Sequence, residues 1–154
     1  MKTVKHLLSL SLFFSSVLFA GDREDIINVV MESNDYQVKN KRSMDIYSKE
    51  GALEFWSSGG LMNKIEGAEG RINEFESVSM SIKHIEVLVL VPKKAAVAMY
   101  YSEGSMTPKG SKPVNHYMTR VTQVFVKENG EWKVRSSHWS PVTGGAGTSQ
   151  TALN

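Results

Sequence analysis

The chain of 154 residues contains no cysteine. Disulfide bonds, thiolate catalysis and metal sites with sulfur ligands are therefore excluded. A large excess of charge is also missing, because 18 lysines and arginines stand against 16 aspartates and glutamates. Proteins that bind nucleic acid need a basic footprint on their surface, and this composition does not supply one. We expect no nucleic-acid partner.

Histidines are few and dispersed, at positions 6, 84, 116 and 138, without the spacing of metal ligands. Two glycine-containing stretches, 58–60 and 144–147, lack the glycine spacing of a phosphate-binding loop. The nucleophile-elbow motif of serine hydrolases is also missing. We therefore expect no metal and no cofactor.

Residues 1–20 have the composition of a secretory signal peptide. Lys2 and Lys5 form a basic start, residues 7–19 are apolar or serine, and the small Ala20 can end the segment. Such a run is too short for a membrane span. We expect export to the periplasm or the medium, with no membrane association once the segment is removed. A single domain over 21–142 would follow, then a flexible Gly-, Ser- and Thr-rich tail over 143–154.

Three helices are expected in the first half of the domain. The first runs from Asp22, a suitable N-cap, to about Lys39, with apolar residues at helical spacing. A short second helix is expected over Met44–Ser48 and a third over Gly67–Ser77.

Strands are expected over Ala52–Ser57, Lys83–Val91 and Ala95–Gly104, followed by a loop over Met106–Pro113. Helices gathered before a mostly antiparallel sheet indicate an α+β fold, with the helices on one face of a curved sheet.

The stretch Asn115–Pro141 predicts a β-hairpin, because two β-rich runs flank the Asn129-Gly130 pair. A two-residue loop would pair Phe125 with Val134 and Val121 with His138. The same register would pair Gln123 with Ser136 and Arg120 with Trp139. A three-residue loop with a bulge is the alternative, and it exchanges the faces. We favour the two-residue loop because it separates most charges from an inner face that holds Tyr117, Thr119, Val121, Gln123, Phe125, Trp132, Val134, Ser136 and His138.

Three motifs carry a family resemblance. They are Tyr47-Ser-Lys-Glu-Gly-Ala-Leu-Glu-Phe-Trp56, Gly67 before the expected third helix, and the ending Thr119-Arg-Val-Thr122, Gly130-Glu-Trp132 and His138-Trp-Ser140. With the order of elements, these resemble the SnoaL-like branch of the nuclear-transport-factor-2-like superfamily. The ending is also similar to the association domains of calmodulin-dependent kinases.

This resemblance implies a cystatin-like cone: three helices packed on a strongly curved, mostly antiparallel sheet, usually as a homodimer, with a cavity between sheet and helices. Members include ketosteroid isomerases, cyclases, dehydratases and proteins that only bind or scaffold, so the fold does not fix the function. The isomerases need a carboxylate base and a Tyr/Asp pair in the cavity. Here the expected strands carry Glu54, Glu86 and Glu103 but no aspartate.

The candidate site residues come from the expected inner face. His138 is the candidate catalytic base, although a histidine there can also serve a structural hydrogen bond. Arg120 would bind a carboxylate if it points inward and would be solvated if outward. The remaining candidates for ligand contact are Trp56, Tyr100, Tyr117, Gln123 and Trp139.

Three hypotheses follow. The one we favour is a binding protein that holds a small, largely apolar molecule without turnover, because the inner face is apolar with a few polar groups and has no matched acid and base. An isomerase- or dehydratase-like enzyme using His138 is the second. An oligomerising interaction module is the third.

Overall fold

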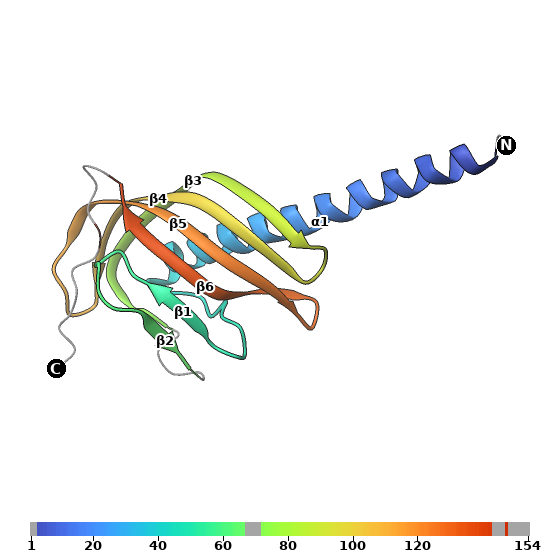
Figure 1. Cartoon of the computed structure of the whole chain (residues 1–154). Helices are drawn as coiled ribbons and strands as arrows, with labels where there is room; N and C mark the ends of the chain where they lie inside the picture. Colours follow the sequence, from blue (N-terminus) through green and yellow to red (C-terminus); the bar gives the residue numbers. More distant parts are fainter. Residues whose placement is uncertain (1–2, 67–71, 143–146, 148–154) are drawn as a thin grey trace.

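The computed structural model describes residues 3–66, 72–142 and 147, with side chains from Gly21 onward. Within these residues the chain forms one helix followed by six strands (Figure 1). The elements are α1 (Thr3–Asn40), β1 (Ala52–Phe55), β2 (Asn63–Ile65), β3 (Phe75–Val91), β4 (Ala95–Pro108), β5 (Val114–Glu128) and β6 (Glu131–Pro141).

The six strands form one mixed sheet in the order β2-β1-β6-β5-β4-β3. Every neighbouring pair is antiparallel except β1 and β6, which run parallel. The sheet curves, and α1 lies across its concave face (Figure 1). The predicted α+β architecture with a curved, mostly antiparallel sheet is confirmed.

The prediction of three helices was wrong, because the described residues contain only α1. The expected first helix lies within α1, but Asp22 is inside the helix and does not cap it. Met44–Ser48 is extended: the Ser48 N–H donates to the Val134 carbonyl, and the Val134 N–H donates to the Ile46 carbonyl. A segment that supplies these groups to β6 cannot use them in a helix.

The expected third helix falls partly on residues 67–71, which lie outside the described residues. Its last residues, from Phe75, begin β3 instead. In the part of the chain that has been described, no helix has the length and apolar content to span a membrane. The expected tail over 143–154 also lies outside the described residues, apart from Gly147.

The strands predicted around Ala52, Lys83 and Ala95 are all present. β3 and β4 are longer than expected: β3 begins at Phe75, and β4 continues to Pro108, into the first residues of the segment predicted as a loop. β2 was not predicted. Gly104 has a φ of +149°, and the register of β4 against β5 shifts just after it, so this glycine bends the sheet.

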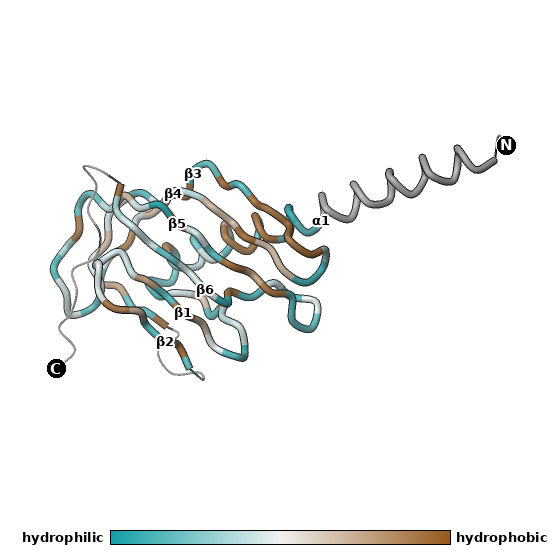
Figure 2. The backbone as a smooth tube through the Cα atoms, viewed as in Figure 1, coloured by the Kyte–Doolittle hydropathy of each residue, from teal (hydrophilic) through white to brown (hydrophobic). Residues whose placement is uncertain are grey.

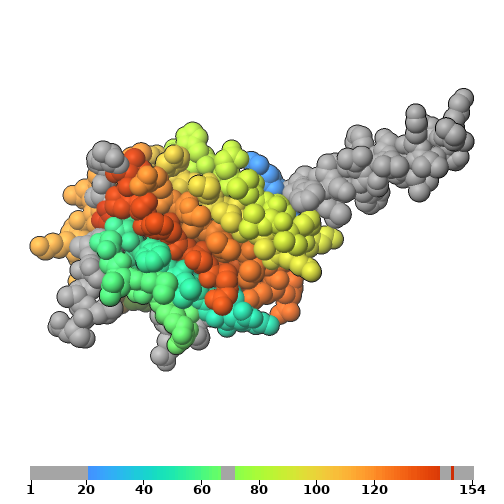
Figure 3. All heavy atoms as spheres, viewed as in Figure 1, coloured from blue at the N-terminus to red at the C-terminus, as the bar shows by residue number. Residues whose placement is uncertain are grey.

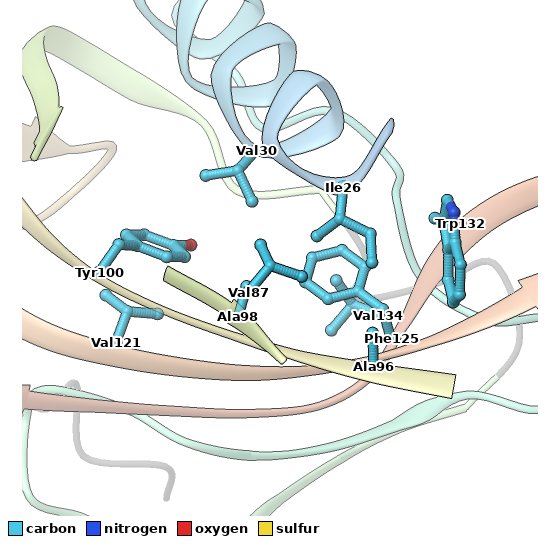
Figure 4. Close-up of a cluster of buried hydrophobic side chains, with 10 residues drawn as sticks. All are labelled: Ile26, Val30, Val87, Ala96, Ala98, Tyr100, Val121, Phe125, Trp132 and Val134. Carbon is cyan, nitrogen blue, oxygen red and sulfur yellow. The ribbon is translucent and has the colours of Figure 1, made fainter. Parts of the chain in front are cut away.

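The main core lies where α1 meets the concave face. Ile26 and Val30 of α1 point onto the sheet, toward Val87 and Phe125 (Figure 4). The other buried members come from β4, β5 and β6: Ala96, Ala98, Tyr100, Val121, Trp132 and Val134. A second, smaller cluster near the other end of β3 to β5 contains Met80, Met106, Val114 and Tyr117. Colouring by hydropathy shows apolar stretches in both α1 and the long strands (Figure 2).

The predicted hairpin is present, with a two-residue turn at Asn129 and Gly130. Their φ angles of 50° and 88° match the type I′ turn that joins twisted strands. Phe125 pairs with Val134, as the favoured register requires. Beyond this pair the prediction was wrong, because the register shifts and Val124 pairs with Ser136.

Arg135 is the extra residue that causes this shift, which makes it a β-bulge. A bulge reverses the faces of all residues after it. Ser137 is therefore buried, whereas His138 is exposed. Thr122, on the outer face, is the residue that pairs with His138, and Val121 pairs with Trp139.

Candidate functional site

A cavity of about 820 Å³ opens between the concave face of the sheet and the end of α1. Val30, Ile46 and Ile82 give it apolar walls, and serine, tyrosine, tryptophan and amide side chains interrupt them. This size suits a small organic molecule, and the mixed lining is typical of ligand sites.

A buried carboxylate lies in the wall of this cavity. Glu54 is 3% exposed and receives hydrogen bonds from three neutral donors. The Tyr47 hydroxyl donates to Oε1 at 3.0 Å, the Ser137 hydroxyl donates to the same oxygen, and the Trp56 indole N–H donates to Oε2 at 2.8 Å. The Trp139 indole N–H donates in turn to Ser137 Oγ at 3.3 Å. These four donors fix the carboxylate in place.

Two further tyrosine hydroxyls lie in the cavity wall. Tyr100 donates to Gln123 Oε1 at 2.8 Å, and Tyr117 donates to Ser57 Oγ at 3.3 Å. Burial raises the pKa of Tyr100 and of Tyr117 above the ordinary value of 10.0. Burial, and then the charge of Glu54, raises the pKa of Tyr47. All three phenols are therefore neutral hydrogen-bonding groups at physiological pH.

Five of the seven predicted site residues line the cavity: Trp56, Tyr100, Tyr117, Gln123 and Trp139. Arg120 does not, because it lies on the outer face, where it donates to the Pro141 carbonyl at 3.4 Å. His138 also lies on the outer face, and its ring packs against Phe55 with centroids 5.5 Å apart. The structure thus brings five of the candidates together in the cavity wall and leaves Arg120 and His138 on the outer face of the sheet.

His138 is consequently not in a position to act as a base in this cavity. The expectation that placed it inside assumed an unbroken register in β6, and the bulge at Arg135 moves it to the other face. Across the described residues, no three histidine or acidic side chains are grouped so as to hold a metal ion.

Glu54 and Tyr47 were not among the predicted site residues. The sequence Ala52-Leu53-Glu54-Phe55 favours the two large apolar residues as the buried ones. The structure has the opposite arrangement, since Leu53 is 40% and Phe55 is 47% exposed. The sequence does hold one signal for a buried acceptor at this place. It is Trp56, because an indole N–H near the protein interior needs a hydrogen-bond acceptor, and Glu54 provides it.

No protein-family model matches this chain, and no curated protein matches it. Solved structures do. A protein of Exiguobacterium sibiricum described as a calcium/calmodulin-dependent kinase II association domain is 11% identical, with a TM-score of 0.54 over 77% of this chain and 91% of the other. An NTF2-like protein of unknown function from Prochlorococcus is 19% identical, with a TM-score of 0.50 over 85% and 97%.

The association domain of CaMKII from C. elegans is 17% identical, with a TM-score of 0.51 over 76% of this chain and 93% of that domain. At these identities the similarity establishes the fold and nothing finer. The chain therefore has the nuclear-transport-factor-2-like fold that the sequence resemblance implied.

Proposed function

We propose that this nuclear-transport-factor-2-like domain binds a small, largely apolar molecule in the cavity between α1 and the sheet. The observation that carries the proposal is the cavity itself, about 820 Å³ in volume, with apolar walls and a few fixed polar groups. A fold built only to scaffold a partner would gain stability by filling this space with side chains.

Binding without turnover fits the polar groups better than catalysis does. The candidate base, His138, lies outside the cavity. The buried acid, Glu54, already accepts from Tyr47, Ser137 and Trp56. A carboxylate held by three donors is suited to a fixed electrostatic role, because proton transfer would require those bonds to rearrange.

Titration with N-phenyl-1-naphthylamine, a neutral fluorescent apolar probe, tests the proposal. The wild-type protein is expected to bind the probe with saturation, and Trp56→Ala to weaken binding about tenfold through lost contact area. His138→Ala is the matched control, because it changes an aromatic side chain on the other face and should leave the affinity unchanged. Absence of saturable binding, or equal loss in both variants, would refute the proposal.

Two finer assignments accompany it. We place the domain in the SnoaL-like branch, on the motifs from Tyr47 to Trp56 and from Thr119 to Ser140. We also propose export, on the composition of residues 1–20. Mass measurement of the mature protein from cells checks the second: a chain that begins near Gly21 is expected, and a full-length intracellular chain would contradict it.

A second function, self-association, is favoured by the outer face of the sheet. Six large apolar side chains are exposed there: Leu53 and Phe55 of β1, Leu88 and Leu90 of β3, and Met99 and Tyr101 of β4. Figure 3 looks onto this face, with β3 to β6 side by side and most of the described part of α1 hidden behind them. Exposed apolar side chains on one face of a sheet favour an interface, and two of the structural neighbours are association domains.

We propose that two copies pair through this face to form a homodimer. Light scattering after size exclusion should give twice the monomer mass for the wild-type protein. Met99→Glu, at a half-exposed position of β4 on this face, should give the monomer mass, whereas Glu32→Gln on the exposed side of α1 should not. A monomeric wild-type protein at tens of micromolar would contradict the proposal.

A further inference from the structure

We infer that the molecule held in the cavity carries a protonated amino group, which binds Glu54. This inference rests on the proposed binding function and specifies the chemistry of the ligand.

The hydrogen-bond count leaves room for one more donor. An ionised carboxylate offers about four acceptor positions, two on each oxygen. Oε1 of Glu54 uses both, for Tyr47 and Ser137, whereas Oε2 receives only the Trp56 indole N–H. Glu54 lines the cavity, and Oε2 is its oxygen with an acceptor position left for a bound molecule.

The charge of Glu54 is not neutralised within the described residues. Its three donors are neutral, and among the ion pairs of these residues none includes Glu54. The two described lysines in the cavity wall are already paired: Lys64 with Glu66, and Lys109 with Glu74 at 2.6 Å. A buried carboxylate without a cation gains most from a ligand that brings one.

Aromatic side chains surround the same position. Trp56 and Tyr47 bind Glu54 directly, Trp139 binds it through Ser137, and Tyr100 packs edge-on against Trp139 with centroids 6.2 Å apart. Trp56 and Tyr47 turn their polar edges to Glu54, so they fix the carboxylate, while their apolar surfaces and those of Trp139 and Tyr100 suit the carbon chain next to an ammonium group. The negative charge of Glu54 disfavours a ligand carboxylate at this end of the cavity.

Three probes with one apolar body and different head groups test the inference: octylamine, octanol and octanoate, titrated by tryptophan fluorescence at pH 7. We expect octylamine to bind at least about tenfold more tightly than octanol, the size of one hydrogen bond to a charged group. Octanoate should bind more weakly than octanol.

Variants locate the effect at Glu54. Glu54→Gln keeps the volume and an acceptor for Trp56, since the two hydroxyls can reverse to accept from the amide. It should reduce the ratio of octylamine to octanol affinity to about one. Glu32→Gln, exposed on α1 and outside the cavity, makes the same change in net charge and should preserve the ratio.

The outcomes separate the two levels of the argument. If octanol binds but octanoate binds as tightly as octylamine, the inference is overturned and the proposed function stands; this comparison needs only the wild-type protein. If the variant Glu54→Gln is folded and keeps the wild-type ratio, the inference is also overturned. If none of the three probes binds, the proposed function fails and the inference fails with it.

Discussion

The bulge at Arg135 can be tested with two adjacent substitutions, Ser137→Ala and His138→Ala. With an unbroken two-residue register, His138 would be buried and Ser137 would face solvent. The structure reverses these positions, so the two registers predict opposite orders of stability.

The magnitudes follow from the contacts of each side chain. Ser137 is buried and donates to the Glu54 carboxylate, so removal of its hydroxyl should cost about 2 kcal/mol, the value for a hydrogen bond to a charged group. The same change leaves the Trp139 indole N–H without its acceptor. His138 is exposed and loses only its contact with the Phe55 ring, which should cost less than about 1 kcal/mol.

Equilibrium urea unfolding, followed by circular dichroism, measures both variants. With an m-value of about 2 kcal/mol per molar urea, Ser137→Ala should lower the midpoint by about 1 M and His138→Ala by less than about 0.5 M. Equal m-values for the variants and the wild type would show that the comparison is between similar transitions. A larger loss for His138→Ala than for Ser137→Ala would refute the described register and the cavity geometry built on it.

Three other predictions concern the rest of the domain. Gly104→Ala should destabilise the protein by more than about 3 kcal/mol, because the new Cβ would lie 2.0 Å from the Ser79 carbonyl oxygen. Gly110→Ala is the control in the same urea assay: Gly110 also has a positive φ but open space around it, so the change should cost about 1 kcal/mol. Asp22→Ala should raise amide exchange around position 22 in the middle of α1, because it removes the acceptor for the Lys93 N–H at 2.7 Å and the buried partner of Lys127 at 3.3 Å. Stability should fall as pH rises through 10, because burial raises the pKa of Tyr100 and the residue keeps its proton in the folded state while the unfolded chain ionises. In unfolding titrations, Tyr100→Phe should reduce the total loss between pH 9 and pH 11 by about 1.4 kcal/mol.

The sequence predicted the long strands because their signals are local. Alternation in β3 puts Val87 and Leu88 on opposite faces of the strand, and the structure buries Val87 and exposes Leu88. Asn129 and Gly130 adopt the positive φ angles that the turn demands. These features depend on neighbours within a few residues, so they could be inferred from the chain alone.

The short elements were predicted less well, because contacts distant in sequence decide them. Met44–Ser48 has a helical cap signal, but it pairs with β6 near Val134. β2, of three residues, exists through its pairing with β1. Weak local preference yields in both cases to backbone hydrogen bonds with a distant strand.

By itself the sequence determined the α+β class, the curved sheet and its final hairpin, and most of the aromatic residues of the cavity. Only the tertiary structure decided which side chains in the last part of β6 face the cavity. As a result, Ser137 and Glu54 lie at the site, while His138 and Arg120 do not. The physical reason is that one extra residue at Arg135 reverses the faces of a strand, and no local preference in the chain marks its position. Its position is set where β6 passes from the segment around Tyr47 to its parallel pairing with β1, a meeting that only the folded chain creates.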